Sequence, residues 1–210
     1  MLFIIIVASL SYTMFKGKGN KETQTLYSRL KALENLKIAT FAGGCFWCME
    51  GPFQEQDGVE EVIAGFAGGQ EKNPNYELVV SGATGHRESV QVFFNPEKIT
   101  YKELLDTYWL QIDPTDPGGQ FADRGNHYTT AIFYHDEEQK KTAEESKSEK
   151  DKSGKYEKEI VTEVLPFSTF YPAEDYHQDY YLKQTDQYKR YEVLSGRQKY
   201  KVEIKKKLGI

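Results

Sequence analysis

Both cysteines of the chain lie at a predicted junction between a strand and a helix. The apolar run LKIATFA, residues 36–42, is typical of a strand, and Gly43-Gly44 ends it. The sequence CFWCMEGPFQEQ then indicates a helix that begins directly after the glycines, with Cys45 at its amino end. Cys48 follows one turn later on the same face. The two thiols of the 210-residue chain therefore lie within four consecutive positions at the amino end of one helix.

Strand-like and helix-like segments alternate along the chain without a strict βαβ rhythm. Thr100 and Glu103 form a capping-box pattern ahead of an amphipathic helix. The segment ESVQVFF alternates cleanly, and the residues on one of its faces are Glu88, Val90, Val92 and Phe94. Further strands are predicted at 59–69, 128–134 and 159–167, and further helices at 136–152 and 172–184. This mixture favours an α+β sandwich over a doubly wound parallel sheet.

The N-terminal segment differs from the rest. Residues 1–15 are apolar and uncharged, which indicates a signal or a membrane anchor, and residues 16–36 indicate a polar linker. The span is shorter than the ~20 residues that usually cross a membrane, and a buried strand or helix is the alternative. The apolar run and its position argue for an exported or tethered protein, with a cytoplasmic location as the alternative. The lysines after it favour a cytoplasmic C-terminal side, which argues against export. One folded domain is predicted over 37–190, followed by a basic tail at 191–210.

The overall composition excludes some classes of function. The net charge is −5, from 27 basic and 32 acidic residues, which is unlike the basic surface of a nucleic-acid binder. Aromatic residues make up 14% of the chain, and its 15 tyrosines suit either a core and its rim or a pocket that needs hydroxyl donors. Two cysteines cannot form a disulfide framework, and they leave one disulfide, half a metal site or one redox pair.

The redox pair is the chemically sharpest of these hypotheses. A helix N-terminus lowers the pKa of a thiol, so the position of Cys45 predicts a reactive thiolate. Pro52 cannot donate to the carbonyl of Cys48, which weakens the helix where a transient disulfide would form. Two inert buried thiols and a thioredoxin-type exchanger remain open, although the bulky Phe46 and Trp47 suit a pocket for a small apolar group. A zinc site needs two more ligands, and no paired motif exists among His86, His127, His135 and His177.

Four blocks of sequence, in order, resemble the A-type peptide methionine sulfoxide reductase family. They are GCFWC at 44–48, GATGHRESVQV at 82–92, DPGGQFADRGNHY at 116–128 and FYPAEDYHQDYYL at 170–182. The resemblance extends from about residue 38 to residue 183. It implies a two-layer α+β sandwich, in which a mixed, mainly antiparallel sheet packs with helices as a ferredoxin-like plait, with an extended, loop-rich C-terminal part. It also makes 37–190 the catalytic domain.

The resemblance implies a role for each residue of a sulfoxide-reducing site. Cys45 attacks the sulfur of methionine S-sulfoxide, and Glu88 protonates the leaving oxygen. At the edge of an apolar strand face Glu88 should have a raised pKa, whereas an isolated glutamate there is more often an ordinary strand-edge residue. Tyr76 and Tyr128 match the family's hydroxyl donors to the oxygen, and either alone is more often a rim or core tyrosine.

The remaining roles are those of Asp123, the aromatic pair and the second cysteine. Asp123 matches a carboxylate that orders the site, with a turn residue beside a glycine as the competing interpretation. Phe46 and Trp47 form the wall of the pocket for the substrate's methyl group. Cys48 is the other thiol of the chain, so it resolves the sulfenic acid of Cys45 if resolution is intramolecular.

The resemblance also implies the partners. The substrates are oxidised proteins and free methionine sulfoxide, the reductant is thioredoxin or a similar dithiol, and no cofactor or metal takes part. The expected role is repair of oxidative damage by a monomer that binds no nucleic acid. Thr129 stands where the family commonly has arginine, so a charge contact is missing at that position. A non-catalytic redox sensor that uses the same two thiols is the alternative class.

Overall fold

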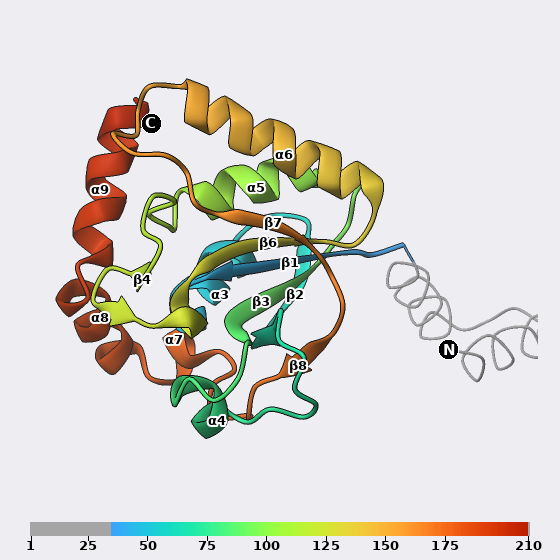
Figure 1. Cartoon of the computed structure of the whole chain (residues 1–210), viewed down its shortest axis with the longest axis vertical. Helices are drawn as coiled ribbons and strands as arrows, with labels where there is room; N and C mark the ends of the chain where they lie inside the picture. Colours follow the sequence, from blue (N-terminus) through green and yellow to red (C-terminus); the bar gives the residue numbers. More distant parts are fainter. Residues whose placement is uncertain (1–34, 210) are drawn as a thin grey trace, which may run out of the picture. The chain divides into compact units, whose positions relative to one another are not determined.

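The computed structural model describes residues 35–209, and a compact unit begins at Lys37. Its centre is a six-stranded sheet with the order β7-β6-β1-β3-β2-β8 (Figure 1). All neighbouring strands are antiparallel except β6 and β7, which confirms a mixed, mainly antiparallel sheet. The strands are β1 Lys37–Gly43, β2 Val59–Ala67, β3 Arg87–Phe94, β6 Thr130–Tyr134, β7 Glu163–Pro166 and β8 Phe170–Pro172, and a separate pair is formed by β4 Gly119–Gln120 and β5 Asp123–Arg124.

The predicted location is corrected by this structure. Export or membrane tethering was expected from the apolar segment 1–15, which lies outside the described residues, as does most of the linker 16–36. Within residues 35–209, no helix has both the length and the apolar character needed to cross a bilayer. We therefore withdraw the prediction.

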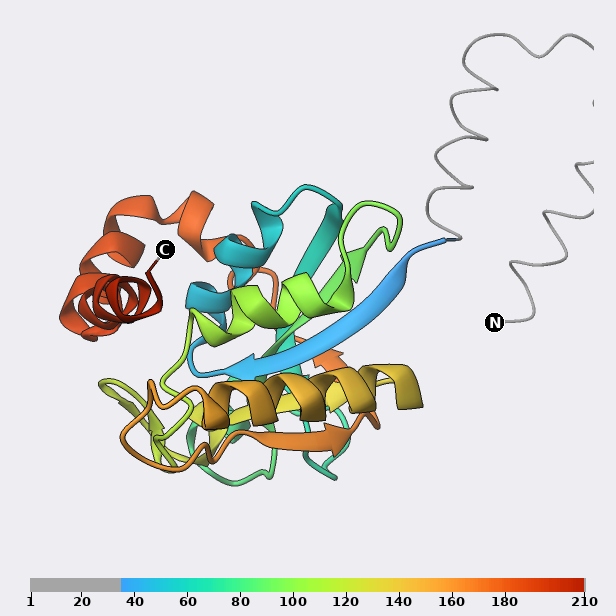
Figure 2. The same ribbon diagram turned by 90° about the horizontal axis from the view of Figure 1, so that it is seen from above.

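Three helices pack on the same face of the sheet and bury its apolar side. They are α3 Phe46–Gln54, α5 Tyr101–Trp109 and α6 Glu137–Lys152. Helices α5 and α6 run next to each other, α5 against β1 and α6 against β6 and β7 (Figure 2). The predicted capping box is confirmed: the Glu103 amide donates to Thr100 Oγ1 at 3.2 Å, and the Thr100 amide donates to Glu103 Oε2 at 2.8 Å. An α+β architecture of sheet and helices is thus present.

The core is built on Phe41 of β1. Its ring lies 5.1 Å from the ring of Phe53 on α3 and 5.1 Å from that of Tyr108 on α5, so that one side chain joins both helices to the sheet. The predicted strand face is also confirmed, because its four members, Glu88, Val90, Val92 and Phe94, are all buried. A carboxylic acid therefore continues the apolar face of β3.

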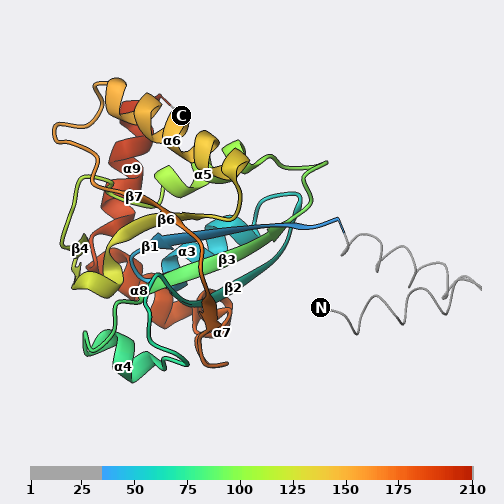
Figure 3. The same cartoon turned by 45° about the vertical axis from the view of Figure 1, so that its right-hand side comes forward.

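The C-terminal part differs from the prediction in two ways. Pro172 ends β8 and does not begin a helix, because the extended chain there pairs with β2 and the Ala173 amide donates to the carbonyl of Ala64 at 2.9 Å. The expected loop-rich part ends near residue 179, and three helices follow it. They are α7 Tyr180–Lys183, α8 Thr185–Leu194 and α9 Arg197–Leu208. In Figures 1 and 3, α9 lies next to β4.

Replacing Phe41 with alanine should lower the free energy of unfolding by about 3–5 kcal/mol, because a fully buried ring is lost from the contact between sheet and helices. Urea unfolding at neutral pH measures the change. Phe93→Ala is the matched control, because this ring is only half-buried on the opposite face of β3. Equal losses in the two variants would contradict the central position given to Phe41.

Candidate active site

The turn between β1 and α3 places both thiols inside the protein. Gly44 has φ +79, and a Cβ on it would stand 2.7 Å from the guanidinium of Arg197 and from Cβ of Gln120, so a glycine is required there. Cys45 is the N-cap residue of α3 and is 4% exposed, and Cys48 is completely buried one turn later. Both thiols are free, and the Cys48 amide donates to the Cys45 carbonyl at 3.1 Å.

Glu88 is joined directly to the start of the cysteine helix. Its Oε2 accepts a hydrogen bond from the backbone amide of Phe46 at 3.0 Å, and the side chain is 1% exposed. The pKa of Glu88 is raised to about 8, mainly by burial and also by the nearby charges of Asp123 and Cys48, which together outweigh the lowering by the Phe46 amide and by Arg197. The carboxyl group therefore carries a proton near neutral pH, as the strand pattern predicts.

Two tyrosines approach Cys45 and Glu88 from loops outside the sheet. Tyr76 begins the short helix α4, Tyr76–Val80, and Tyr128 ends the 3₁₀ helix η1, Asn126–Tyr128. Burial raises the pKa of Tyr76 to about 12, with contributions from the charges of Glu88 and Cys45. The same causes raise the pKa of Tyr128. Both phenols therefore keep their protons and remain hydrogen-bond donors beside the thiol and the acid.

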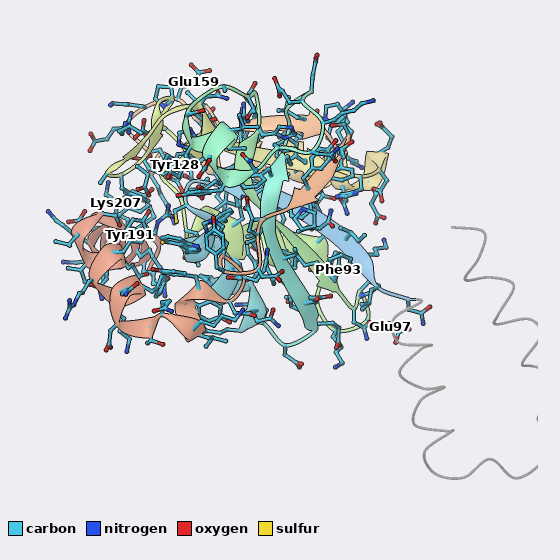
Figure 4. All side chains as sticks on the ribbon, turned by 90° about the horizontal axis from the view of Figure 1, so that it is seen from below. Phe93, Glu97, Tyr128, Glu159, Tyr191 and Lys207 are labelled. Atoms are coloured by element: carbon cyan, nitrogen blue, oxygen red, sulfur yellow. The ribbon has the colours of Figure 1, made fainter. Side chains whose placement is uncertain are left out.

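Asp123 acts on the thiol side of the site through a residue that the sequence did not reveal. Tyr191 of α8 donates its hydroxyl hydrogen to Asp123 Oδ2, and the nearby Tyr191 hydroxyl lowers the pKa of the Cys45 thiol. Tyr128 and Tyr191 lie toward one end of the molecule, whereas Phe93 lies toward the other (Figure 4). Tyr191 falls within the segment interpreted as a basic tail, where no local pattern indicates a site.

The charge distribution over the thiol pair differs from the expectation. Burial raises the pKa of the Cys45 thiol, and this effect is larger than the lowering of the pKa that a helix N-terminus is expected to produce. The first amide of α3 is already bonded to Glu88. The hydrogen bond between the sulfurs lowers the pKa of Cys48, and the positive charge of Arg197 lowers it as well. In the substrate-free protein burial therefore works against ionisation of Cys45, and Cys48 is the thiol whose pKa is lowered.

The aromatic pair between the cysteines is held in place by the C-terminal block. Trp47 stacks on Tyr180 with ring centroids 3.8 Å apart, and its Nε1 donates to Nδ1 of His177 at 3.2 Å. Phe46 is buried, with its ring 5.0 Å from that of His177 and 6.4 Å from that of Tyr76. These rings are rigidly placed beside the tyrosine hydroxyls, as a wall for a small apolar group requires.

The structure thus brings together the acid, both tyrosines, Asp123 and both cysteines. Thr129, where the family commonly has arginine, is the C-cap residue that follows η1, and its hydroxyl donates to the carbonyl of Asn126 at 2.7 Å. Within residues 35–209, no cluster of three or more histidine, cysteine or acidic side chains is placed to hold a metal ion. The arrangement can place a nucleophilic sulfur and a proton donor on one small polar group.

Comparison with known proteins identifies the family. The family model described as peptide methionine sulfoxide reductase matches residues 37–208. The chain belongs to this family. It is 56% identical over 165 residues to the peptide methionine sulfoxide reductase MsrA of Bacillus velezensis, covering 79% of this chain and 93% of that protein. It is 55% identical to MsrA of Listeria monocytogenes over 164 residues, or 78% and 93% of the two chains. The chain is therefore a peptide-methionine sulfoxide reductase, as its sequence blocks predict.

Solved structures of the family agree with the fold. The reduced form of Mxr1 from Saccharomyces cerevisiae superposes with a TM-score of 0.68 at 33% identity, covering 72% of this chain and 87% of that one. Methionine sulfoxide reductase A of Corynebacterium diphtheriae superposes with a TM-score of 0.65 at 31% identity, covering 72% of this chain and 76% of that one. Mxr1 in complex with Trx2 gives 0.50 at 26%, covering 70% and 86%. The present structure thus resembles reduced Mxr1 more than Mxr1 in that complex.

The raised pKa of Glu88 predicts a pH-dependent stability. A carboxyl group with a folded pKa above its unfolded value stabilises the protein fully at low pH, and this contribution is lost as the pH rises through the folded value. Relative to Glu88→Gln, the wild-type free energy of unfolding should fall between about pH 5 and pH 8, by up to about 1.4 kcal/mol per pH unit. Urea unfolding across this range measures it. Glu97→Gln changes an exposed position, and its free energy of unfolding should depend on pH in the same way as that of wild type. If the free energy of Glu88→Gln also showed the same pH dependence as wild type, the raised pKa would be disproved.

Proposed function

We propose that the chain reduces the S epimer of methionine sulfoxide, free and in proteins, by attack of Cys45 on the sulfoxide sulfur. The observation that carries this proposal is the bond between Phe46 N and Glu88, which holds a protonated acid at the start of the cysteine helix. A sulfoxide oxygen needs a proton to leave sulfur, and an acid with a pKa near the working pH is suited to supply it. Repair of oxidised methionine in proteins is the corresponding biological role.

The first step transfers the sulfoxide oxygen to Cys45. The sulfur of Cys45 forms a bond to the substrate sulfur while Glu88 gives its proton to the oxygen. The hydroxyl group formed in this way passes from the substrate sulfur to the Cys45 sulfur, which becomes a sulfenic acid. The bond between the two sulfurs breaks, its electron pair stays on the methionine that leaves, and the proton of the Cys45 thiol replaces the one that Glu88 gave. Tyr76 and Tyr128, which keep their hydrogens, donate to the oxygen as charge develops on it. Neutral donors in a site that excludes water stabilise that charge strongly.

Two further groups orient the reactants. Phe46 and Trp47 hold the substrate's methyl group, since their rings are fixed by His177 and Tyr180. Asp123 accepts the hydroxyl hydrogen of Tyr191 and so fixes the position of this hydroxyl near Cys45. Both arrangements fix the attacking sulfur relative to the sulfoxide before the reaction begins, which reduces the entropic part of the barrier.

The second step is resolution by Cys48. Its thiolate attacks the sulfur of the sulfenic acid, the sulfur–oxygen bond breaks, and the hydroxide takes a proton and leaves as water. A disulfide joins Cys45 to Cys48, with the two electrons that reduced the sulfoxide supplied by the pair. Pro52 supports this step, because it leaves the carbonyl of Cys48 without the usual donor inside α3.

An external dithiol of the thioredoxin type then reduces the disulfide, and no metal or cofactor is needed. The support is that Mxr1 forms a complex with Trx2. Both sulfurs are buried in this structure, so the disulfide must move before a reductant reaches it. Mxr1 in its unusual oxidized form superposes with a TM-score of 0.53, lower than its reduced form, which is consistent with such a movement.

We also propose the finer assignments of architecture. The order β6-β1-β3-β2, with α3 between β1 and β2 and α5 between β3 and β6, supports a ferredoxin-like plait. A catalytic domain that begins at residue 37 is extended here from residue 190 to residue 208, supported by the family match and by the position of Tyr191. A monomer is proposed because one chain supplies every residue of the site.

Purified protein with dithiothreitol or thioredoxin should reduce the S epimer of methionine sulfoxide and leave the R epimer unchanged. Glu88→Gln should lower the rate by about 10²–10⁴ because the oxygen loses its acid. The measurement is chromatographic detection of methionine from the separated epimers, with the exposed-site variant Glu159→Gln as control. A redox sensor predicts that Glu88 is irrelevant, so full activity of Glu88→Gln would favour that alternative over the enzyme.

Cys48→Ser should form about one methionine per chain and then stop, because the sulfenic acid of Cys45 forms without an internal thiol to resolve it. The amount of methionine made without reductant, together with trapping of the sulfenic acid by dimedone, measures this. Cys45→Ser should make no methionine under the same conditions. Sustained thioredoxin-coupled turnover by Cys48→Ser would overturn the resolving role.

A further inference from the structure

Arg197 is a fully buried cation at the first position of α9. Its Nη1 donates to the carbonyl of Gln111 at 2.6 Å, and its Nη2 donates to the carbonyl of Gly43 at 3.2 Å. The guanidinium also lies 4.8 Å from the ring centre of Phe121. Its Nε, which is buried too, has no hydrogen-bond partner among the described residues. A side chain from the far end of the chain therefore packs directly against the turn that leads into the cysteines.

This guanidinium lacks the partner that a buried positive charge normally has. Within residues 35–209, the arginines that form ion pairs are Arg87 and Arg124, and Arg197 is bonded to backbone carbonyls alone. Burying a guanidinium without an anion costs several kcal/mol, so proteins rarely do it without compensation. An ionisable group close to Arg197 is expected to supply the negative charge.

The candidate for that anion is the sulfur of Cys48. Nη2 of Arg197 stands 2.7 Å from the position of a Cβ on Gly44, so the charge lies within the turn that carries both thiols. The charge is close enough to lower the pKa of Cys48, and it acts on the acid Glu88 in the same direction. Cys48 is completely buried, and little solvent screening separates the two groups.

We propose that Arg197 is a positioning residue for resolution, which provides the Cys48 sulfur with a fixed positive partner so that it attacks the oxidised Cys45 as an anion. The proposal rests on the resolving role of Cys48 proposed above. In this step Arg197 neither gains nor loses a proton. It keeps the electron pair of Cys48 available until the new sulfur–sulfur bond forms and hydroxide departs to become water.

The other groups that face Cys48 do not supply a lasting positive charge or hydrogen bond to its sulfur. Glu88, Asp123 and Glu192 carry negative charge when ionised and oppose a thiolate, and Glu192 is itself engaged by Lys201 at 2.9 Å. The phenols of Tyr188 and Tyr191 stay neutral because burial raises the pKa of each. The Cys45 thiol donates to Cys48 in the reduced state, but a sulfenic acid replaces that thiol when resolution begins. Arg197 is the positive charge that lowers the pKa of Cys48, and it is present in both states.

The test begins with a protein that contains one thiol. In Cys45→Ser, the ultraviolet absorbance of the thiolate gives the pKa of Cys48, with Cys45→Ser, Cys48→Ser as the blank. We expect a pKa below the ordinary value of about 8.5. Adding Arg197→Gln, which can still donate to a carbonyl but carries no charge, should raise that pKa by about one unit, a tenfold loss of thiolate near neutral pH. Arg197→Lys should keep the pKa close to its starting value.

A control separates charge at this position from charge in general. Lys199 lies two residues further along α9 and is 81% exposed, and Lys199→Gln should leave the pKa of Cys48 unchanged. A pKa of Cys48 at or above the ordinary value in Cys45→Ser would overturn the proposal, and this result needs no change at Arg197. An equal pKa with and without Arg197→Gln would overturn it as well.

A kinetic arm distinguishes this role from a purely structural one. With methionine S-sulfoxide and no reductant, wild type and Arg197→Gln should each form about one methionine per chain at similar rates. Quenching the reaction at intervals and counting free thiols by mass spectrometry gives the rate of disulfide formation. This rate should be about tenfold lower in Arg197→Gln than in wild type near neutral pH, and the two rates should become equal at high pH. A slowing that is equal at every pH indicates a structural role and contradicts the proposal. Absence of methionine from both proteins would instead refute the proposed function, while the titration result would stand.

Discussion

One hydrogen bond, from the amide of Phe46 to the carboxyl group of Glu88, connects the start of α3 to β3. The sheet makes this bond possible, because the register of β1 and β3 places Ala42 opposite Ser89 and so brings the glycine turn to the level of Glu88. The first amides of a helix have no partner inside it, and a buried carboxyl group needs a donor. Each group satisfies the other. The position of the acid relative to Cys45 therefore follows from strand pairing and needs no flexible loop.

Burial has opposite consequences for the two groups that this bond connects. It keeps the proton on Glu88, which suits an acid that must protonate an oxygen. It also raises the pKa of Cys45, which works against a nucleophile that reacts as its thiolate. Only Tyr191 offsets the second effect, and the neighbouring sulfur of Cys48 adds to it. Burial thus keeps a proton donor in place at Glu88, and of the two thiols it is Cys48 whose pKa is lowered.

The sequence predicted those parts of the fold and site that local patterns determine. The capping box at Thr100, the alternation of β3 and the cysteine helix after the glycines were confirmed because each depends on neighbouring residues. The helix predicted from Pro172 was wrong, since pairing with β2 extends the chain where its local preference is helical. Tyr191 could not be found, because the polar helices at the C-terminus carry no apolar periodicity that shows which face packs inward. The contact of that helix with Asp123 is long-range and leaves no local trace in the sequence.

The first turn of α3 links thiol chemistry to distant parts of the fold. A disulfide requires a sulfur–sulfur distance of about 2.05 Å and a narrow range of torsion angles, which an unstrained helical turn does not provide. The turn must therefore change shape when Cys45 joins Cys48. It carries the amide bonded to Glu88, and the glycine carbonyl that Arg197 holds comes just before it. Any shift of this turn is thus transmitted to β3 on one side and to α9 on the other. Gly43 and Arg197 are 154 positions apart in the sequence and are joined by one hydrogen bond. Through this bond the oxidation state of two sulfurs is connected to the packing of α9.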